Sequence, residues 1–266
     1  MHDFDFEYDG TYLSDYGFVI GSFDGSSESD LNGSQISFNQ TSVKMGRKFL
    51  LANTKYEEVL TCEFDICKKN CEGTREGFYI TGEEERKIRR WLNRKQYCKL
   101  QFLSERYEDI YFMGSFNVSA KELGGQIVSL HLIFTADSPF GYTDVNFKAH
   151  ITENDNSFVI QDMSDETGDD IINMEITCQK NENLIITNDF NKRVTKISNC
   201  SVGEIITMKN MIISSSIENR NEKIMNNFNF IFPMISNSFT NRKNTFTFSM
   251  PCDVTFSYKQ TRKIGI

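Results

Sequence analysis

The side chains best suited to chemistry are cysteines in the N-terminal half of the chain. Cys62, Cys67 and Cys71 lie close together in the sequence, and Cys98 would complete a set of four thiolate ligands for zinc. Structural zinc sites space their ligands as two close pairs, and Cys98 has neither a cysteine nor a histidine beside it. We therefore expect these thiols to carry no metal. The other cysteines, Cys178, Cys200 and Cys252, each fall in or beside a strand-like stretch and are expected to behave as small apolar residues.

The 3 histidines, His2, His131 and His150, leave few possible bases for a catalytic triad. His131 is the one serious candidate. It falls in a strand-like segment and shares a strand face with Ser129 rather than with the apolar residues, so we expect a solvated or interface histidine and not a general base. The Gly-x-Ser-x-Gly pattern of a nucleophile elbow is also missing from the sequence. We predict no catalytic residue.

An acidic stretch in the second half could suggest calcium binding or the paired carboxylates of a glycosidase. It lacks the Asp-x-Asp-x-Asp-Gly order of a calcium loop, so we expect a solvated loop. Gly124-Gly125 likewise lacks the third glycine and the following helix of a phosphate-binding loop. We predict neither a metal nor a cofactor. The residues of the acidic stretch are Asp162, Asp165, Glu166, Asp169 and Asp170.

The charge balance argues against nucleic-acid binding. With 37 acidic and 29 basic residues the chain has a net charge of -8, which repels a phosphate backbone. The first residues show no basic stretch followed by an apolar run, and nowhere do about 18 apolar residues follow one another. We expect no secretion signal and no membrane insertion. Folding in a reducing cytoplasm would then keep the 7 cysteines as thiols.

Length and composition predict two domains that are mainly β. The 266 residues exceed the usual single domain, and the aromatic share of 13% suits the pleated, half-buried surface of sheets. The opening segment from Phe4 to Gly10 alternates aromatic and acidic residues, which predicts a strand with one buried face. Alternating segments from about Gln35 to Ile66 predict a long hairpin with a basic tip at Met45-Gly46-Arg47-Lys48. Such an arm needs a partner surface.

One helix is predicted from Glu83 to Arg94. Thr81 and Glu84 have the spacing of a capping box, which defines its start. Ile88, Trp91 and Leu92 form a narrow apolar stripe, so the helix should pack by one face on a sheet.

A tight hairpin is predicted around Gly124-Gly125, with strands at Ile110–Val118 and Ile127–Phe134. In the second strand Val128, Leu130, Leu132 and Phe134 share a face. The break at Ser138–Tyr142, with its proline and glycine, indicates the end of the first domain nearby.

Short strands recur from about Ile151 onward without further helix signals, which predicts a β-sandwich. One expected strand covers Phe228–Phe232. The last two, Asn244–Ser249 and Asp253–Tyr258, alternate cleanly and are joined through Met250-Pro251-Cys252, so we expect a terminal hairpin.

The order of these features resembles the distal tail protein (Dit) family of long-tailed bacteriophages. The likeness covers nearly the whole chain, and the first 140 residues or so carry most of it. The motifs that carry it are Tyr8-Asp9-Gly10, Ser14-Asp15-Tyr16-Gly17, Trp91-Leu92 on a helix, Phe134–Phe140 closing a hairpin, and the late pair Asn244-Thr245.

The resemblance implies a structural role at the tip of the virion tail. The N-terminal domain (residues 1–145) would be an α+β unit, a β-sandwich with one helix and a long hairpin arm, that forms a homohexameric ring. The C-terminal domain (residues 146–266) would be a galectin-like β-sandwich. The arm around Met45, Gly46, Arg47 and Lys48 would clasp the neighbouring subunit.

The same resemblance implies the partners. The ring would join the tail tube protein to the tail-tip hub protein, with the tape measure protein as a further candidate. Folding and assembly would take place in the bacterial host cytoplasm. The family has no catalytic residues to transfer.

Two other functions stay open from the sequence. The C-terminal domain could bind cell-wall sugar through exposed Tyr or Phe side chains, since the only tryptophan, Trp91, lies on the helix of the first domain. A wall-degrading enzyme is the third hypothesis, and it rests only on the acidic stretch and His131.

Overall fold

The computed structural model describes residues 5–21, 36–42, 49–69 and 77–264. The chain divides into two compact units. The first comprises residues 1–142 together with 262–266, and the second comprises residues 143–261. The sequence placed the boundary between residues 145 and 146, and it assigned the last five residues to the second domain. The mainly β fold with one principal helix is confirmed.

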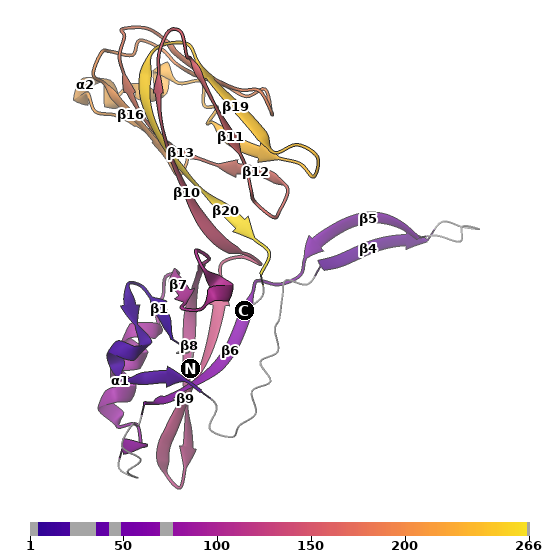
Figure 1. The fold of residues 1–266 in the computed structure, drawn as a ribbon, viewed down its shortest axis with the longest axis vertical. Helices are drawn as coiled ribbons and strands as arrows, with labels where there is room; N and C mark the ends of the chain where they lie inside the picture. The colour runs from indigo at the N-terminus through magenta and orange to yellow at the C-terminus, as the bar shows by residue number, and fades with distance from the viewer. Residues whose placement is uncertain (1–4, 22–35, 43–48, 70–76, 265–266) are drawn as a thin grey trace. The chain divides into compact units, whose positions relative to one another are not determined.

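The first unit is built on one sheet of seven strands in the order β2-β1-β7-β8-β9-β6-β3, with antiparallel pairing throughout (Figure 1). Short 3-10 turns at Leu13–Tyr16 and Glu105–Tyr107 connect its strands. The strands are β1 (Phe6–Tyr8), β2 (Thr11–Tyr12), β3 (Phe18–Ile20), β6 (Thr61–Lys68), β7 (Cys98–Phe102), β8 (Phe112–Leu123) and β9 (Gln126–Ala136).

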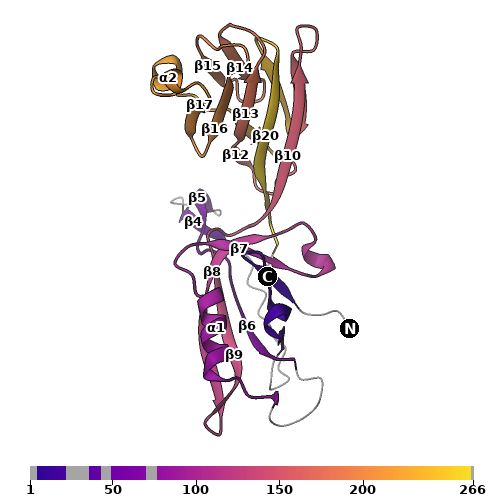
Figure 2. The ribbon, with the colours of Figure 1, turned by 90° about the vertical axis from the view of Figure 1, so that its left-hand side faces the viewer.

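Helix α1 (Gly82–Leu92) lies alongside β8 (Figure 2). The predicted capping box is confirmed: Thr81 Oγ1 accepts a hydrogen bond from the Glu84 amide at 3.3 Å, and Glu84 Oε2 accepts one from the Thr81 amide at 2.8 Å. The Lys68 ammonium also lies 2.7 Å from Glu84, which ties the helix start to the end of β6. As expected, Ile88, Trp91 and Leu92 are buried.

Trp91 anchors the helix in an aromatic core. Its ring stacks on Phe6 at 5.7 Å and on Tyr16 at 4.7 Å, measured between ring centroids. Its indole nitrogen donates a 3.0 Å hydrogen bond to the carbonyl of Tyr8. A buried tryptophan needs such an acceptor, since its N–H would otherwise be left without a partner. The helix, the first strand and the turn after it are therefore held by one side chain.

The β8–β9 hairpin forms at the predicted glycine pair. Gly124 and Gly125 both have positive φ, +62° and +79°, as a tight turn of the primed type requires. The four residues predicted to share a face, Val128, Leu130, Leu132 and Phe134, are all buried. Gly114 in β8 permits close packing, because a Cβ there would lie 2.4 Å from the Phe134 ring.

The predicted long hairpin is shorter than expected. Strands β4 (Ile36–Ser42) and β5 (Phe49–Tyr56) pair with each other and, within the described residues, join no other sheet (Figure 1). The segment 61–66, which the sequence assigned to the hairpin, belongs to β6 in the seven-stranded sheet. The reason is burial: Cys62 and Ile66 lie in the core of the first unit, where a hairpin arm could not place them.

The second unit is the predicted β-sandwich. One sheet has the order β10-β20-β13-β16-β17, the other β11-β19-β14-β15, and β12 and β18 form a separate pair. Its strands are β10 (Gly141–Ile151), β11 (Ser157–Gln161), β12 (Gly168–Ile171), β13 (Asn173–Cys178), β14 (Leu184–Asn188), β15 (Val194–Ile197), β16 (Ile205–Lys209), β17 (Ile212–Ser215), β18 (Met234–Asn237), β19 (Lys243–Phe248) and β20 (Cys252–Arg262).

The expected terminal hairpin is wrong. β19 pairs with β11 and β14 in one sheet, whereas β20 pairs with β13 in the other. Both strands alternate because their apolar residues face each other across the sandwich, as the 6.2 Å contact between the Phe246 and Phe256 rings shows. The stretch 228–232 is also no strand, apart from one isolated bridge at Phe228. Two short helical turns, α2 (Glu218–Asn221) and η4 (Ile224–Asn227), precede it.

Replacing Trp91 with alanine should lower the free energy of unfolding by about 3 to 5 kcal/mol, since it leaves a cavity and removes the bond to Tyr8. Urea denaturation followed by circular dichroism measures this. Arg90→Ala, an exposed change on the same helix turn, is the matched control and should stay within about 0.5 kcal/mol of the wild type. Equal effects of the two changes would contradict this account of the core.

Candidate functional site

The hairpin β4–β5 presents an apolar face that no second layer of the described residues covers. Ile36, Phe38 and Leu51 are 44%, 58% and 57% exposed. The pairing register places them on one side: Phe38 lies opposite Thr54, and Gln40 lies opposite Leu51. The register shifts between Asn39 and Gln40, so that Ala52 is the extra residue of a β-bulge. Without this bulge Leu51 would point to the other face.

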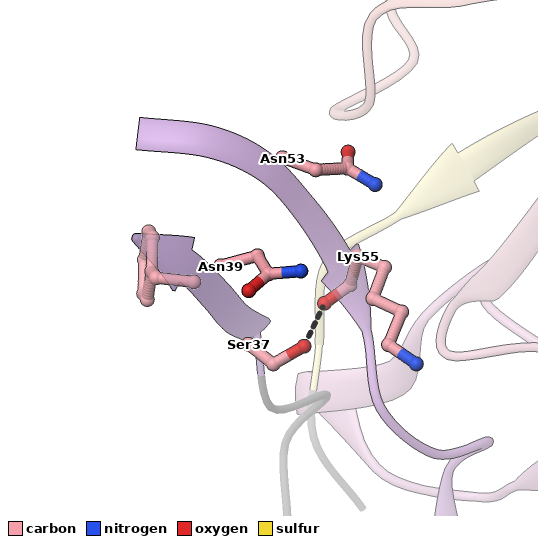
Figure 3. A pocket seen from close by; sticks show the side chains of 5 residues that line it. Ser37, Asn39, Asn53 and Lys55 are labelled. Atoms are coloured by element: carbon pink, nitrogen blue, oxygen red, sulfur yellow. Dashed lines mark hydrogen bonds between the residues drawn. The ribbon is translucent and has the colours of Figure 1, made fainter. Parts of the chain in front are cut away.

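The opposite face of the hairpin is polar. Ser37 pairs with Lys55 and Asn39 pairs with Asn53, and together with Phe38 these residues line a shallow hollow of about 310 Å³ (Figure 3). The Ser37 hydroxyl donates a 3.4 Å hydrogen bond to the Lys55 carbonyl. The amides of the two asparagines offer donors and acceptors at the surface. One face of the arm therefore suits an apolar contact, and the other suits polar contacts or water.

The base of the arm is fixed by aromatic contacts. The Tyr56 ring meets the Phe140 ring edge to face, with centroids 4.9 Å apart. The Lys263 ammonium lies 5.9 Å from the Tyr56 ring centroid, within the range of a cation–π contact. Because Lys263 belongs to the end of the chain, this contact ties the last residues to the arm's root.

The predicted arm tip, Met45-Gly46-Arg47-Lys48, lies outside the described residues. The sequence identified the arm but not the exposed side chains along its shaft. The spacing of Ile36 and Phe38 was a usable signal for the apolar face. The position of Leu51 gave no such signal, because an alternating pattern that continued through Ala52 would assign Leu51 to the polar face.

The predicted thiol cluster behaves as free cysteines where it is described. Cys62 and Cys98 are buried and Cys67 is partly buried, and none forms a disulfide. Burial raises the pKa of Cys62 to about 12, so its thiol stays protonated at neutral pH. Cys71 lies outside the described residues. Among the residues that the structure describes, no three His, Cys, Asp or Glu side chains gather in a way that could hold a metal ion.

His131 takes part in a charge cluster on a sheet face. Its Nδ1 lies 2.8 Å from Asp65, which also binds the Lys121 ammonium at 2.5 Å, and its Nε2 lies 3.5 Å from Glu63. As predicted, the register puts Ser129 and His131 on one face of β9, but Ser129 is fully buried and its hydroxyl has no hydrogen-bond partner among the described residues. The far ring nitrogen faces a carboxylate and not a hydroxyl or thiol, so the geometry is not that of a nucleophile and its base.

The acidic stretch is only partly the solvated loop that the sequence predicted: Asp165 and Asp169 are exposed, but Asp162 is not. Asp162 is fully buried and accepts hydrogen bonds from the Ser164 hydroxyl at 2.9 Å, from Tyr258 at 3.1 Å and from the Asn237 amide. Asp169 accepts a bond from Ser236, which belongs to β18. Asp162 therefore attaches the β12–β18 pair to the sandwich through Asn237 of β18 and Tyr258 of β20, whereas the Asp169 bond lies within the pair.

Asp170 lies near these carboxylates and is partly buried. Burial, with further contributions from the negative charges of Asp162 and Asp169, raises its pKa to about 6.

These features define a class of protein: a two-unit β protein with a hairpin arm that exposes one apolar face. Family models of phage tail proteins match both parts. The model described as a phage tail protein N-terminal domain covers residues 1–138, and that of a phage tail C-terminal domain covers residues 140–258. The chain belongs to this family of phage tail proteins.

Solved structures with the same fold agree. The chain is similar to the crystal structure of the SPP1 Dit (gp 19.1) protein, titled a paradigm of the hub adsorption apparatus in Gram-positive infecting phages, with a TM-score of 0.65, 12% identity and coverage of 96% of this chain and 98% of that one. It is also similar to a chain of the phage P2 baseplate in its activated conformation. The form with Ca gives a TM-score of 0.57, 11% identity and coverage of 99% and 100%. The form with Sr gives a TM-score of 0.54, 12% identity and coverage of 98% of this chain and 99% of that one.

The predicted likeness to the distal tail proteins is thus confirmed at the level of the fold. A search of curated protein sequences gives no match. Among the described residues, no helix has the length and apolar character needed to cross a membrane.

Replacing Asp170 with asparagine should stabilise the protein at pH 7.5 by on the order of 1 kcal/mol, allowing for solvent screening of a partly exposed group. Because the pKa of Asp170 is raised on folding, the folded chain holds this proton more tightly, and stability falls as pH rises from about 4 to about 6. The variant Asp170→Asn should lack this loss of stability. Thermal unfolding across this pH range measures the stability of both proteins, with the exposed Asp155→Asn as control. An unchanged pH profile in Asp170→Asn would contradict the assignment.

Proposed function

We propose that this chain is a structural, non-enzymatic subunit of a phage tail tip, and that its copies form a homohexameric ring through their hairpin arms. The observation that carries the proposal is the uncovered apolar face of the arm, formed by Ile36, Phe38 and Leu51. A two-stranded hairpin is at best marginally stable alone and needs a surface to pack on. The family and the fold of the SPP1 Dit protein support this reading.

The energetic gain of such packing is modest for one arm and large for a ring. Burying each of the three apolar side chains contributes on the order of 1 kcal/mol. An arm that packs on a different surface of its neighbour makes a head-to-tail contact, which repeats until the ring closes. Each subunit then gives one arm and receives one.

The proposed ring forms from the first unit, with the arm tip Met45–Lys48 reaching onto the neighbour. The second unit, residues 143–261, is the galectin-like sandwich of the proposal. The ring would join the tail tube protein to the tail-tip hub protein, with contact to the tape measure protein. The similarity to a hub adsorption protein and to a baseplate chain supports this position. Folding and assembly would take place in the host cytoplasm.

A second candidate function is sugar binding by the C-terminal sandwich. The observation that favours it is a pair of solvent-exposed aromatic side chains in that unit, Phe230 at 63% and Phe239 at 85% exposure. Aromatic rings at the surface suit stacking on sugar faces. Binding of the full chain to purified host wall polysaccharide tests this, with Phe230→Ala and Phe239→Ala as the variants that should lose it. Equal binding by both variants would remove the candidate.

The arm is tested by removing its apolar face. The wild type should sediment at about 185 kDa, six times the 30.8 kDa of one chain, and the double variant Phe38→Ser with Leu51→Ser should sediment as a single chain. Sedimentation velocity at several protein concentrations measures both.

The matched control is Asn39→Ser with Asn53→Ser, which changes the same two strands on their polar face and should leave assembly intact. Assembly of the apolar-face variant like the wild type would contradict the role of the arm. A wild type that stays a single chain at high concentration would contradict the ring itself.

A further inference from the structure

Three cysteines from distant parts of the sequence meet inside the C-terminal sandwich. Cys178 ends β13, Cys252 begins β20, and Cys200 follows β15. Their exposures are 1%, 0% and 2%, and all three are free thiols. The sequence treated each as a small apolar residue. The fold instead makes them neighbours, so their chemistry can be considered together.

Cys178 is the central member. It lies directly opposite Cys252 in the antiparallel pair β13–β20, and its thiol interacts with the thiol of Cys200 inside the same buried core cluster. The backbone holds the Cys200 loop against it: the Cys178 amide donates to the Glu204 carbonyl at 2.9 Å, and the Gly203 amide donates to the Cys178 carbonyl at 2.8 Å. These two backbone hydrogen bonds hold the loop that carries Cys200 against the end of β13.

A cation stands beside Cys200. The Arg220 guanidinium lies 3.8 Å from its sulfur and donates to the Ser198 carbonyl at 2.7 Å, so it clamps the loop that carries the cysteine. Arg220 itself is held by the fully buried Glu204. The interaction with the Cys178 thiol, together with the positive charge of Arg220, lowers the pKa of Cys200, whereas the pKa of Cys178 is raised. A thiolate beside an arginine is the reactive form of cysteine.

We propose that Cys178 and Cys200 form a redox-active pair that closes to a disulfide when the protein leaves a reducing medium for an oxidising one. The bond would join β13 of one sheet to the loop after β15 of the other, and so would link the two layers of the sandwich. It depends on the fold of the second unit and not on the proposed ring.

The oxidant is a low-molecular-weight disulfide, RSSR. The Cys200 thiolate attacks one sulfur of RSSR, which forms a protein–SR bond and releases RS⁻. The Cys178 thiol then loses its proton and attacks the Cys200 sulfur, which expels the second RS⁻. The sum is two protein thiols and RSSR giving one protein disulfide and two RSH. Access requires only local opening of the loop, where the nearby Val202 is 59% exposed.

The test is incubation of the full-length protein with oxidised glutathione, followed by non-reducing peptide mapping by mass spectrometry. The expected product is a Cys178–Cys200 linkage. It should raise the melting temperature of the second unit by on the order of 10 °C, and dithiothreitol should reverse the shift. This experiment uses only the wild-type protein, so its result does not depend on whether a variant folds.

Variants then separate the possible pairings. Cys252→Ala and the distant Cys62→Ala should keep the linkage and the temperature shift, whereas Cys200→Ala should lose both. A Cys178–Cys252 bond in the wild type would overturn the pairing. No intramolecular bond after oxidation of the folded protein, or glutathione attached only at Cys67, would overturn the proposal.

Discussion

A two-stranded sheet cannot bury either of its own faces, so the hairpin β4–β5 needs another surface to cover its apolar side. Phe38 and Leu51 lie in water on the same side of the arm, and a single bulge residue, Ala52, keeps them there. An isolated protein gains nothing from such an arrangement. A subunit that packs its arm on a neighbour gains apolar burial at each contact, and the first unit serves as the platform from which the arm extends.

That platform depends on dense aromatic packing. Trp91 joins the helix to Phe6 of the first strand and, through its indole nitrogen, to the backbone at Tyr8. The second unit depends more on polar contacts: buried Asp162 gathers hydrogen bonds from three side chains, and Glu204 pairs with Arg220 inside the fold. Buried polar networks of this kind favour one arrangement of strands over its alternatives, since a shifted register would leave their groups without partners.

The sequence was informative where the determining interactions are local. The Thr81 and Glu84 capping box and the Gly124-Gly125 turn involve residues a few positions apart, and both are as predicted. It failed where partners are distant. Strands β19 and β20 alternate as a hairpin would, but their partners lie far back in the chain. Asp162 was predicted to be exposed because it is acidic, but it is buried because the distant residues Tyr258 and Asn237 supply its hydrogen bonds. The arm itself was predicted, but a bulge cannot be read from alternation, so Leu51 was missed.

The central claim is that the chain assembles into a closed ring, and electron microscopy of the purified full-length protein tests it most directly. Averaged images should show rings of six equal subunits around a central hole, which is the arrangement that a head-to-tail contact produces when it closes. Particles the size of one chain, or open filaments without closure, would contradict the account.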